Sequence, residues 1–304
     1  MDSDKALGPE DRRGGDGPAI TVVIITHNRC AELDRTLAEL DRGGMPPTIV
    51  VDNAGTDATA DVVGRHAAAH PMVRYVRLPQ NIGALGRNHG VTLADTPYVA
   101  FCDDDSWWAP GSLDAAVEVL DAHPEVGALT GRTLVNAENR PDPINAELAA
   151  STLPGPASLP GPRVLGFLAC ATVVRVDAFR SVGGFSPVLG FVGEEALLAM
   201  DLAADGWYAC YVEELVVHHH PSPMRSPSDR RGRELTNSVL TDAMRRPLPR
   251  AARSGATLLG ALLRREVPPG HLGRALSALP GALRHRVRLP PEVERDLVAL
   301  EAGR

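Results

Sequence analysis

The sequence predicts an α/β protein in which helices flank a mostly parallel sheet and a helical extension follows at the C-terminus. Two patterns indicate this fold class. Over residues 20–102, short apolar runs rich in β-branched residues alternate with amphipathic segments of helical period, as strands and their covering helices do in parallel sheets. Beyond residue 223 the strand-like runs cease, and prolines divide a helical pattern into short pieces.

The first half of the chain is expected to supply the central parallel strands of this sheet. Strands are expected at residues 20–26, 47–52, 73–78 and 98–102. The first helix follows Arg29 and carries Leu33, Leu37 and Leu40 on one face. Later helices are expected at residues 58–70 and 84–94, with another beginning near Pro110. Thr26, Asp52 and Asp103 fall at strand ends, so a binding crevice is expected at the carboxyl edge of the sheet.

The second half is less regular. Its expected elements are a Pro-rich surface or lid connection at 131–162, a strand at 165–174, a turn at 183–185, a helix from Glu194 through Asp205, and a strand at 207–217 that ends in three histidines. Pro247, Pro268, Pro280 and Pro290 are expected to separate short helices. The expected divisions of the chain are a disordered tail at 1–17, two parts of the sheet domain at 18–130 and 131–225, and a helical extension at 226–304.

Composition narrows the class of protein. The chain has 304 residues, 44% of them hydrophobic, which is enough for a large core. Four cysteines without a CxxC pair favour reduced thiols in the cytoplasm. The first eighteen residues have no apolar stretch typical of a secretory signal, and the longest apolar runs are too short to span a bilayer. A soluble protein, or one peripheral to the inner face of the membrane, is expected.

Charge is distributed unevenly. Residues 245–290 hold ten arginines and one glutamate, whereas the whole chain has a net charge of −7. The leucines between Arg253 and Arg264 could therefore contact an anionic membrane, or the arginines could form the solvated face of packed helices. Nucleic acid is not an expected partner, because the rest of the chain is acidic and no basic and aromatic residues interleave.

The triplet Asp103-Asp104-Asp105 directly follows an apolar strand and precedes two tryptophans. Adjacent carboxylates repel one another and resist burial, so a bound divalent cation would explain them. Oxygen ligands suit Mg²⁺ or Mn²⁺, ions that often share their coordination with substrate phosphates. A solvated loop, or a helix start capped by Asp105 or Ser106, is the alternative.

Familiar nucleotide motifs are missing, since the chain has neither a GxGxxG after its first strand nor a P-loop. Gly83, Gly86 and Gly90 could let the backbone and Arg87 approach a pyrophosphate. They could equally allow close packing at the start of a helix.

Six motifs, in order, resemble those of the family 2 glycosyltransferases, which have the nucleotide-sugar-binding GT-A fold. They lie at residues 23–29, 50–57, 81–90, 103–105, 175–185 and 193–195. Each motif is weak alone, but the ordered set is specific, and the resemblance covers residues 20–225. It implies that residues 18–130 bind the nucleotide-sugar donor and that residues 131–225 shape the acceptor site and supply the catalytic base.

The resemblance implies a set of donor-site residues, with Asp52 accepting hydrogen bonds from the base and Arg87 near the phosphates. The implied donor-binding residues are Thr26, Asn28, Arg29, Asp52, Asn53, Gly83, Arg87, Asn88, Asp103 and Asp104. Asp103 and Asp105, with His219, are the implied ligands of a Mg²⁺ or Mn²⁺ ion. That ion would act as a Lewis acid for the departing nucleoside diphosphate.

The implied catalytic residues are Glu195 and its neighbour Glu194. The family usually has Asp where this chain has Glu195, and either carboxylate can take a proton from an acceptor hydroxyl as it attacks with inversion. Two acids in a first helical turn also suit the helix dipole, which is a purely structural alternative.

The three consecutive histidines end an expected strand. Alternation places His218 and His220 on one side and His219 on the other, and the resemblance favours His219 as the metal ligand. A structural zinc site and a surface tract without ligand role remain alternatives.

The expected function is metal-assisted, inverting transfer of a sugar from a nucleoside-diphosphate donor to a hydroxyl of a glycan, lipid-linked or small-molecule acceptor. One rival is a sugar-1-phosphate nucleotidyltransferase, although His27-Asn28-Arg29 does not resemble the Gly-rich, basic segment expected after its first strand. Another rival is a noncatalytic nucleotide-sugar-binding protein of the same fold.

Overall fold

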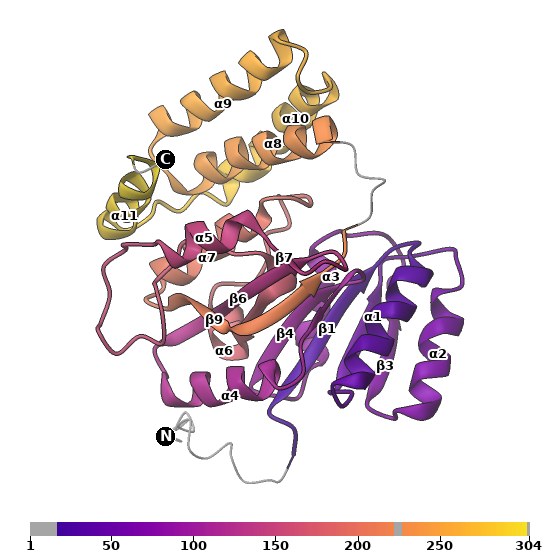
Figure 1. Ribbon diagram of the computed structural model, residues 1–304. Helices are drawn as coiled ribbons and strands as arrows, with labels where there is room; N and C mark the ends of the chain where they lie inside the picture. The colour runs from indigo at the N-terminus through magenta and orange to yellow at the C-terminus, as the bar shows by residue number, and fades with distance from the viewer. Residues whose placement is uncertain (1–16, 222–226, 303–304) are drawn as a thin grey trace, which may run out of the picture.

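The computed structural model describes residues 17–221 and 227–302, so the expected N-terminal tail before residue 17 and Pro223 lie outside the described residues. One mixed sheet of nine strands lies at the centre of the described part, in the order β3-β2-β1-β4-β8-β6-β9-β5, with β7 paired to β6 (Figure 1). The strands are β1 (Ile20–Thr26), β2 (Thr48–Asp52), β3 (Val73–Arg77), β4 (Tyr98–Asp103), β5 (Ser106–Trp108), β6 (Val126–Val135), β7 (Arg140–Pro141), β8 (Thr172–Arg175) and β9 (Tyr208–His219).

Helices cover both faces of this sheet. They are α1 (Cys30–Arg42), α2 (Thr59–Ala69), α3 (Leu85–Leu93), α4 (Ser112–Ala122), α5 (Pro143–Ala149), α6 (Val176–Ser181), α7 (Glu194–Ala204), α8 (Pro227–Arg245), α9 (Leu248–Leu263), α10 (Gly270–Arg284) and α11 (Pro291–Ala302). Apolar residues of α1, α2 and α4 pack on one face, and those of α3, α6 and α7 pack on the other. The mixed α/β fold with a helical C-terminal region is therefore confirmed.

Strands β3, β2, β1 and β4 are parallel, which brings the polar strand ends together. Thr26 pairs with Asp52, and Ile25 pairs with Asp103, so the three polar residues lie at one edge of the sheet. β8 then runs antiparallel between β4 and β6. The expected crevice therefore has its polar rim at the carboxyl ends of the parallel strands.

Alternation along β1 explains why its sequence is apolar throughout. Ile24 and its neighbours on one face pack with α1, whose Leu33 and Leu37 are buried as expected. Val23 faces α3 on the other side, where a Cβ added to Gly90 would lie 2.3 Å from the Cγ1 of Val23. For Gly90, close packing of helix on strand is thus the explanation the structure supports.

One expected connection, and one alternative interpretation of the acidic triplet, were wrong. The segment expected to be a connection from residue 131 continues β6 to Val135, because residues 131–135 pair with β9 and residues 134–135 also pair with β7. Ser106 lies in β5, and α4 has Gly111 at its N-cap, so neither Asp105 nor Ser106 caps that helix. Pairing with strands distant in the sequence determined both the length of β6 and the place of Ser106 in β5. The local sequence does not reveal such pairing.

Two further boundaries also differ from expectation. The strand expected at 165–174 is a short 3₁₀ turn (Ala169–Ala171) followed by β8. Pro280 lies inside α10 and does not end it. Leu276, whose carbonyl loses its helical donor at this proline, is 61% exposed, so water can take the place of that donor.

The helical extension lies beyond the carboxyl edge of the sheet (Figure 1). α8 packs against α9 and α10, and Val293 and Leu297 of α11 pack with Met200 of α7. Among the described residues, no helix combines the length and the apolar character needed to cross a membrane.

Candidate active site

A cavity of about 980 Å³ opens at this edge, between the parallel strands, α7 and α8. Nine of the residues implied by the sequence line it: Thr26, Arg29, Asn53, Arg87, Asp103, Asp104, Glu194, Glu195 and His219. Five others do not line it and lie in the surrounding structure: Asn28, Asp52, Gly83, Asn88 and Asp105. The tertiary structure thus brings together residues that are up to 193 positions apart in the chain.

The acidic triplet is not a solvated loop. Asp104 is 5% exposed and Asp105 is fully buried. Arg29 holds both, because its Nε lies 3.0 Å from Asp104 Oδ1 and its Nη2 lies 2.9 Å from Asp105 Oδ2. Thr26 Oγ1 also donates to Asp104 at 3.0 Å. Burial raises the pKa of Asp104 to about 8, against the lowering effect of the Arg29 guanidinium.

Asp105 and His219 form a pair of which His219 lines the cavity and Asp105 is buried behind it. Asp105 Oδ1 lies 3.4 Å from His219 Nε2, and this buried nitrogen makes no hydrogen bond with any described residue. The pairing of β5 with β9 creates this approach, since Ser106 lies opposite His219. His218 and His220 lie on the other side and contact Trp107, with ring centroids 5.4 and 4.7 Å away. The expected alternation of the histidines is confirmed.

This donor set fits a shared divalent ion. A carboxylate oxygen and an imidazole nitrogen suit Mn²⁺ or Mg²⁺, and such ions often take one or two protein ligands together with substrate phosphates. Asp103, at the end of β4, lines the cavity and could supply a further oxygen. Within residues 17–221 and 227–302, no group of three or more His, Cys, Asp or Glu residues is arranged to hold a metal ion by itself.

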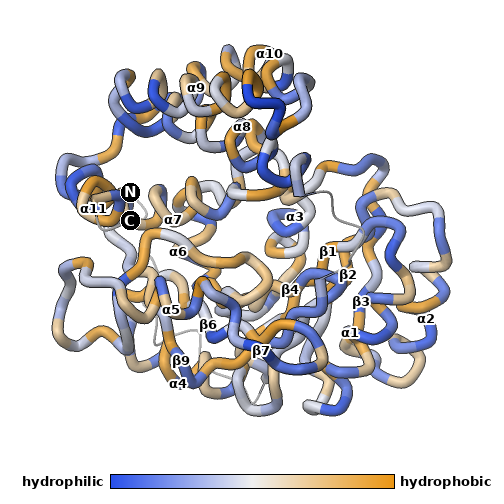
Figure 2. The backbone as a smooth tube through the Cα atoms, turned by 45° about the horizontal axis from the view of Figure 1, so that its top comes forward, coloured by the Kyte–Doolittle hydropathy of each residue, from blue (hydrophilic) through white to orange (hydrophobic). Residues whose placement is uncertain are grey.

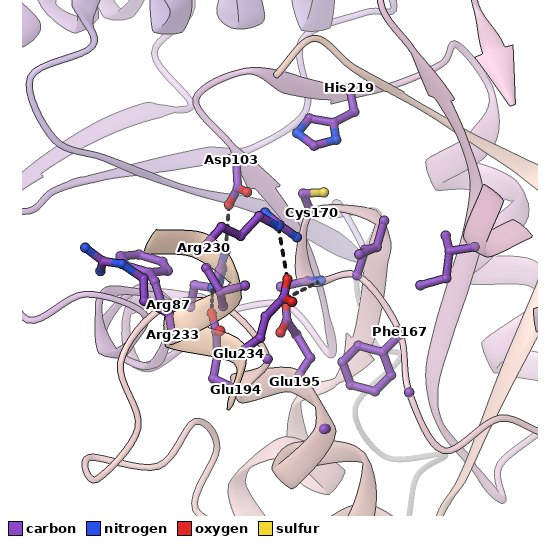
Figure 3. A pocket seen from close by; sticks show the side chains of 18 of the residues that line it. Arg87, Asp103, Phe167, Cys170, Glu194, Glu195, His219, Arg230, Arg233 and Glu234 are labelled. Carbon is purple, nitrogen blue, oxygen red and sulfur yellow. Dashed lines mark hydrogen bonds and ion pairs between the residues drawn. The ribbon is translucent and has the colours of Figure 1, made fainter. Parts of the chain in front are cut away.

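Arg87 joins the triplet to α7. Its Nη2 donates to Asp103 Oδ1 at 2.5 Å, and its Nη1 donates to Glu194 Oε1 at 3.2 Å (Figure 3). The guanidinium is only 2% exposed, and although burial opposes its charge, the neighbouring carboxylates raise its pKa. Burial first, and then the charge of Glu195, raise the pKa of Glu194, while Arg87 opposes that rise.

Glu195 lines the cavity beside this ion-pair chain (Figure 3). Its Oε1 accepts a hydrogen bond from the backbone N–H of Ala169 at 3.4 Å. The turn before α7 is strained, since Val192 has φ of +82°, where β-branched residues rarely lie. Asn237 of α8 donates from Nδ2 to the carbonyls of Gly190 and Val192 and so holds this turn in place.

The residues implied to bind the nucleoside shape the loops after β1 and β2. Asp52 accepts from Gly55 N–H at 2.7 Å and from the Tyr75 hydroxyl at 2.6 Å. Asn28, at φ of +56°, accepts from Thr56 N–H at 2.6 Å, so it ties one loop to the other.

Asn53 and Asn88 tie further loops to this edge. Asn53 accepts from Ile82 N–H and donates to the carbonyl of Gly83, both at 3.2 Å. Asn88 exchanges two 2.9 Å hydrogen bonds with the backbone of Phe185 and thereby fixes the Gly183–Gly184 turn.

Sequence reasoning missed the contribution of the helical extension to the cavity. Charged residues of α8 line it: Asp229, Arg230, Arg233 and Glu234. Their spacing places them on one helical face, but periodicity cannot show what that face meets. An apolar wall was missed too, and it includes Leu148, Leu165, Phe167 and Phe191.

Comparison with known proteins agrees with this geometry. Residues 21–183 match the model of the Glycosyl transferase family 2. The chain is 28% identical, over 235 residues, to N-acetylglucosaminyl-diphospho-decaprenol L-rhamnosyltransferase of Mycobacterium tuberculosis (strain ATCC 25618 / H37Rv), covering 66% of this chain and 76% of that protein. It is 41% identical over 113 residues to validoxylamine A glucosyltransferase of Streptomyces hygroscopicus subsp. limoneus, covering 35% of this chain and 24% of that protein.

Solved structures share the fold. The mannosyltransferase PcManGT from Pyrobaculum calidifontis, in complex with GDP-Man and Mn²⁺, superposes with a TM-score of 0.61 at 24% identity and covers 94% of this chain and 80% of its own. S. aureus TarS 1-349 in complex with UDP-GlcNAc superposes with a TM-score of 0.59 at 17% identity. The match covers 93% of this chain and 87% of the TarS chain. Because the family match spans more than half of the chain and the fold agrees with it, the chain belongs to glycosyl transferase family 2 and is a glycosyltransferase with the GT-A fold.

Proposed function

We propose that this glycosyltransferase moves a sugar from a nucleoside-diphosphate donor to an acceptor hydroxyl, with inversion at the anomeric carbon and with help from Mn²⁺ or Mg²⁺. One observation carries the proposal: a single cavity holds Asp103 and His219 on one side and Glu195 on the other. The neighbouring structures that contain GDP-Man with Mn²⁺, or UDP-GlcNAc, support a donor of this class.

On the donor side, Asp103, Asp105 and His219 would hold the ion. When bound, it would supply Lewis-acid stabilisation for the departing diphosphate. Asn28, Asp52 and Asn53 would position the nucleoside through the loops that they fix. Arg87 forms ion pairs with both Asp103 and Glu194, so it links the donor side of the cavity to the start of α7 on the acceptor side.

On the acceptor side, Glu195 takes the proton of the acceptor hydroxyl. The acceptor oxygen forms its bond to the anomeric carbon opposite the bond that breaks to the diphosphate oxygen. One such displacement inverts the configuration. The Ala169 N–H donates to Oε1 of Glu195, which leaves Oε2 as the proton acceptor.

The acceptor is proposed to be lipid-linked. The cavity carries an apolar wall that includes Leu148, Phe167 and Phe191, which suits a substrate with an apolar portion next to its reacting sugar. The similar mycobacterial protein is named for an acceptor on a decaprenol carrier. A small or glycan acceptor would have less use for this wall.

Thermal unfolding with nucleoside diphosphates tests the donor proposal. We expect one of UDP, GDP and dTDP to raise the Tm in the presence of Mn²⁺, because a ligand at 100 times its Kd stabilises the native state by about 2.7 kcal/mol. His219→Ala should lose the Mn²⁺-dependent part of this rise. His218→Ala is the matched control and should keep it, since His218 contacts Trp107 on the other side of the strand.

The donor proposal would be wrong if none of the three diphosphates changed the Tm of the wild-type protein, with or without Mn²⁺. If His219→Ala and His218→Ala lost the Mn²⁺-dependent rise in Tm equally, His219 would not be a metal ligand.

We also propose that the enzyme works in the cytoplasm and docks on the inner face of the membrane through α9 and α10. Apolar residues recur along both helices at the outer edge of the molecule (Figure 2). The exposed ones are Leu248, Leu259, Leu263, Leu272, Leu276 and Leu283. Arg253, Arg274 and Arg284 are exposed residues of the same two helices and form no ion pair with any described residue, so these helices offer positive charge to anionic lipid. The free thiols of all four cysteines are compatible with a reducing compartment.

Vesicle co-sedimentation tests this docking. The protein should pellet with phosphatidylglycerol vesicles and not with phosphatidylcholine vesicles, and added salt should release it. Changing Leu259 and Leu263 together to Ser should weaken binding by about tenfold or more, since each buried leucine contributes roughly 1.5–3 kcal/mol. Met72→Ser, at a 46% exposed site far from these helices in the fold, is the control. Equal pelleting of both variants and wild type would contradict the proposal.

A further inference from the structure

Two of the arginines that line the cavity belong to the family motifs, and both already form ion pairs with carboxylates. Arg29 bridges Asp104 and Asp105 at 3.0 and 2.9 Å. Arg87 is 2% exposed and bridges Asp103 and Glu194. Both guanidinium groups thus already neutralise buried carboxylates, and turning either one fully to a substrate phosphate would leave a buried carboxylate without its cation, which is costly.

The cavity nevertheless needs positive charge if it is to hold a diphosphate. Among the described residues, seven carboxyl groups and four arginines line it. One divalent ion offsets only part of this excess and of the charge on the substrate. The two remaining arginines, Arg230 and Arg233, come from α8.

These two arginines differ from Arg29 and Arg87 in their environment. The side chains of Arg230 and Arg233 are 48% and 37% exposed. Each pairs with a carboxylate one helical turn away, Arg230 with Glu234 at 3.1 Å (Figure 3) and Arg233 with Asp229 at 2.7 Å. Exposed pairs of this kind contribute little to stability, so they can be exchanged for a phosphate at small cost.

Contacts with α7 and with the turn before it hold α8 in place over the cavity. Asn237, 4% exposed, lies one to two turns after the arginines and donates to the turn that precedes Glu194. Further along, Arg245 forms an ion pair with Asp201 of α7. α8 is therefore fixed to the element that carries Glu195, and its arginines keep their place relative to the reaction centre.

We propose that Arg230 and Arg233 together bind a substrate diphosphate in this cavity, each exchanging its helical carboxylate partner for phosphate oxygens. The guanidinium group suits this role because it donates two parallel hydrogen bonds to a phosphate. The inference rests on the proposed function, and the helical extension thereby becomes part of the active site. The diphosphate belongs either to the nucleotide donor or to a lipid-linked acceptor, and the experiment separates the two.

Calorimetric binding to three single variants tests the inference. Arg230→Gln and Arg233→Gln remove one charge each from the cavity. Arg231→Gln is the matched control, because Arg231 lies between them on α8, is 55% exposed, pairs with Glu266 and does not line the cavity. The probes are UDP, GDP and dTDP with Mn²⁺ for the donor, the corresponding nucleosides, and farnesyl diphosphate for the acceptor.

We expect the Kd of one class of diphosphate to rise about tenfold or more in both cavity variants. Arg231→Gln should stay within about twofold of wild type, as should nucleoside binding in all three variants. A rise confined to nucleoside diphosphates assigns the arginines to the donor, and one confined to farnesyl diphosphate assigns them to the acceptor.

The inference is overturned if all three variants bind both classes of diphosphate as wild type does, or if Arg231→Gln weakens binding as much as the other two. If the wild-type protein bound no nucleoside diphosphate at all, the proposed function itself would fail. These outcomes are distinguishable because the first leaves wild-type binding intact.

Discussion

Changing Glu195 to Gln should lower the rate of sugar transfer by roughly 10²–10⁴-fold, the usual contribution of a positioned general base. The amide keeps the size of the side chain and can still accept from the Ala169 N–H, but it cannot take a proton from the acceptor. Donor binding should remain, since Asp103 and His219, the proposed metal ligands that line the cavity, come from β4 and β9 and not from α7. Single-turnover kinetics and calorimetry with the donor's nucleoside diphosphate measure the two effects separately.

Glu147→Gln is the matched control for this substitution. Glu147 lines the same cavity from α5, so the variant makes the same change of charge away from the start of α7. It should keep kcat within a few-fold of wild type. If Glu195→Gln transferred sugar at the wild-type rate, Glu195 would not be the base, and the role would pass to another cavity carboxylate.

Changing Arg87 to Met should destabilise the protein by about 3–5 kcal/mol, as expected when one partner of a buried ion pair is removed. Methionine fills a similar volume, so the effect comes mainly from the charges left behind. Asp103 and Glu194 would lose the guanidinium that now contacts both. The free energy of unfolding from urea titration measures this loss.

A second substitution identifies the cause of the stability loss in Arg87→Met. Adding Glu194→Gln to Arg87→Met removes one of the orphaned carboxylates and should recover part of the lost stability. Arg65→Met is the exposed control, because Arg65 is 62% exposed in its 3.4 Å pair with Asp34 and should cost at most about 1 kcal/mol. A small effect at Arg87, or no recovery in the double variant, would show that the bridge is not important for stability.

Much of the parallel half of the sheet could be predicted because its signals are local. The apolar runs of β1, β2 and β4 must be buried on both faces, and the leucine spacing of α1 allows only one face to pack. Polar residues at strand ends can then be placed together, since parallel strands share their direction. The histidine alternation at the end of β9 was predictable for the same reason.

Other features depended on partners that are distant in the sequence. Val135 belongs to a strand because it pairs with His219 of β9 and Arg140 of β7, and Pro280 stays in a helix because it is exposed to solvent. The individual roles within the acidic triplet also required coordinates. Asp103 turns to Arg87, whereas Asp104 and Asp105 turn to Arg29, and no pattern in three identical residues distinguishes them.

The sequence alone determined the fold class and the set of polar residues at the carboxyl edge, because burial and periodicity act over a few neighbouring positions. The family was indicated separately, by the resemblance of six ordered motifs. Only the tertiary structure decided which charges meet. Arg87 reaches Glu194 across 107 positions, and α8 brings Arg230 and Arg233 into the cavity through contacts with α7. Ion pairs depend on distances between side chains that the chain's order does not specify, so the arrangement of the candidate active site became visible only in three dimensions.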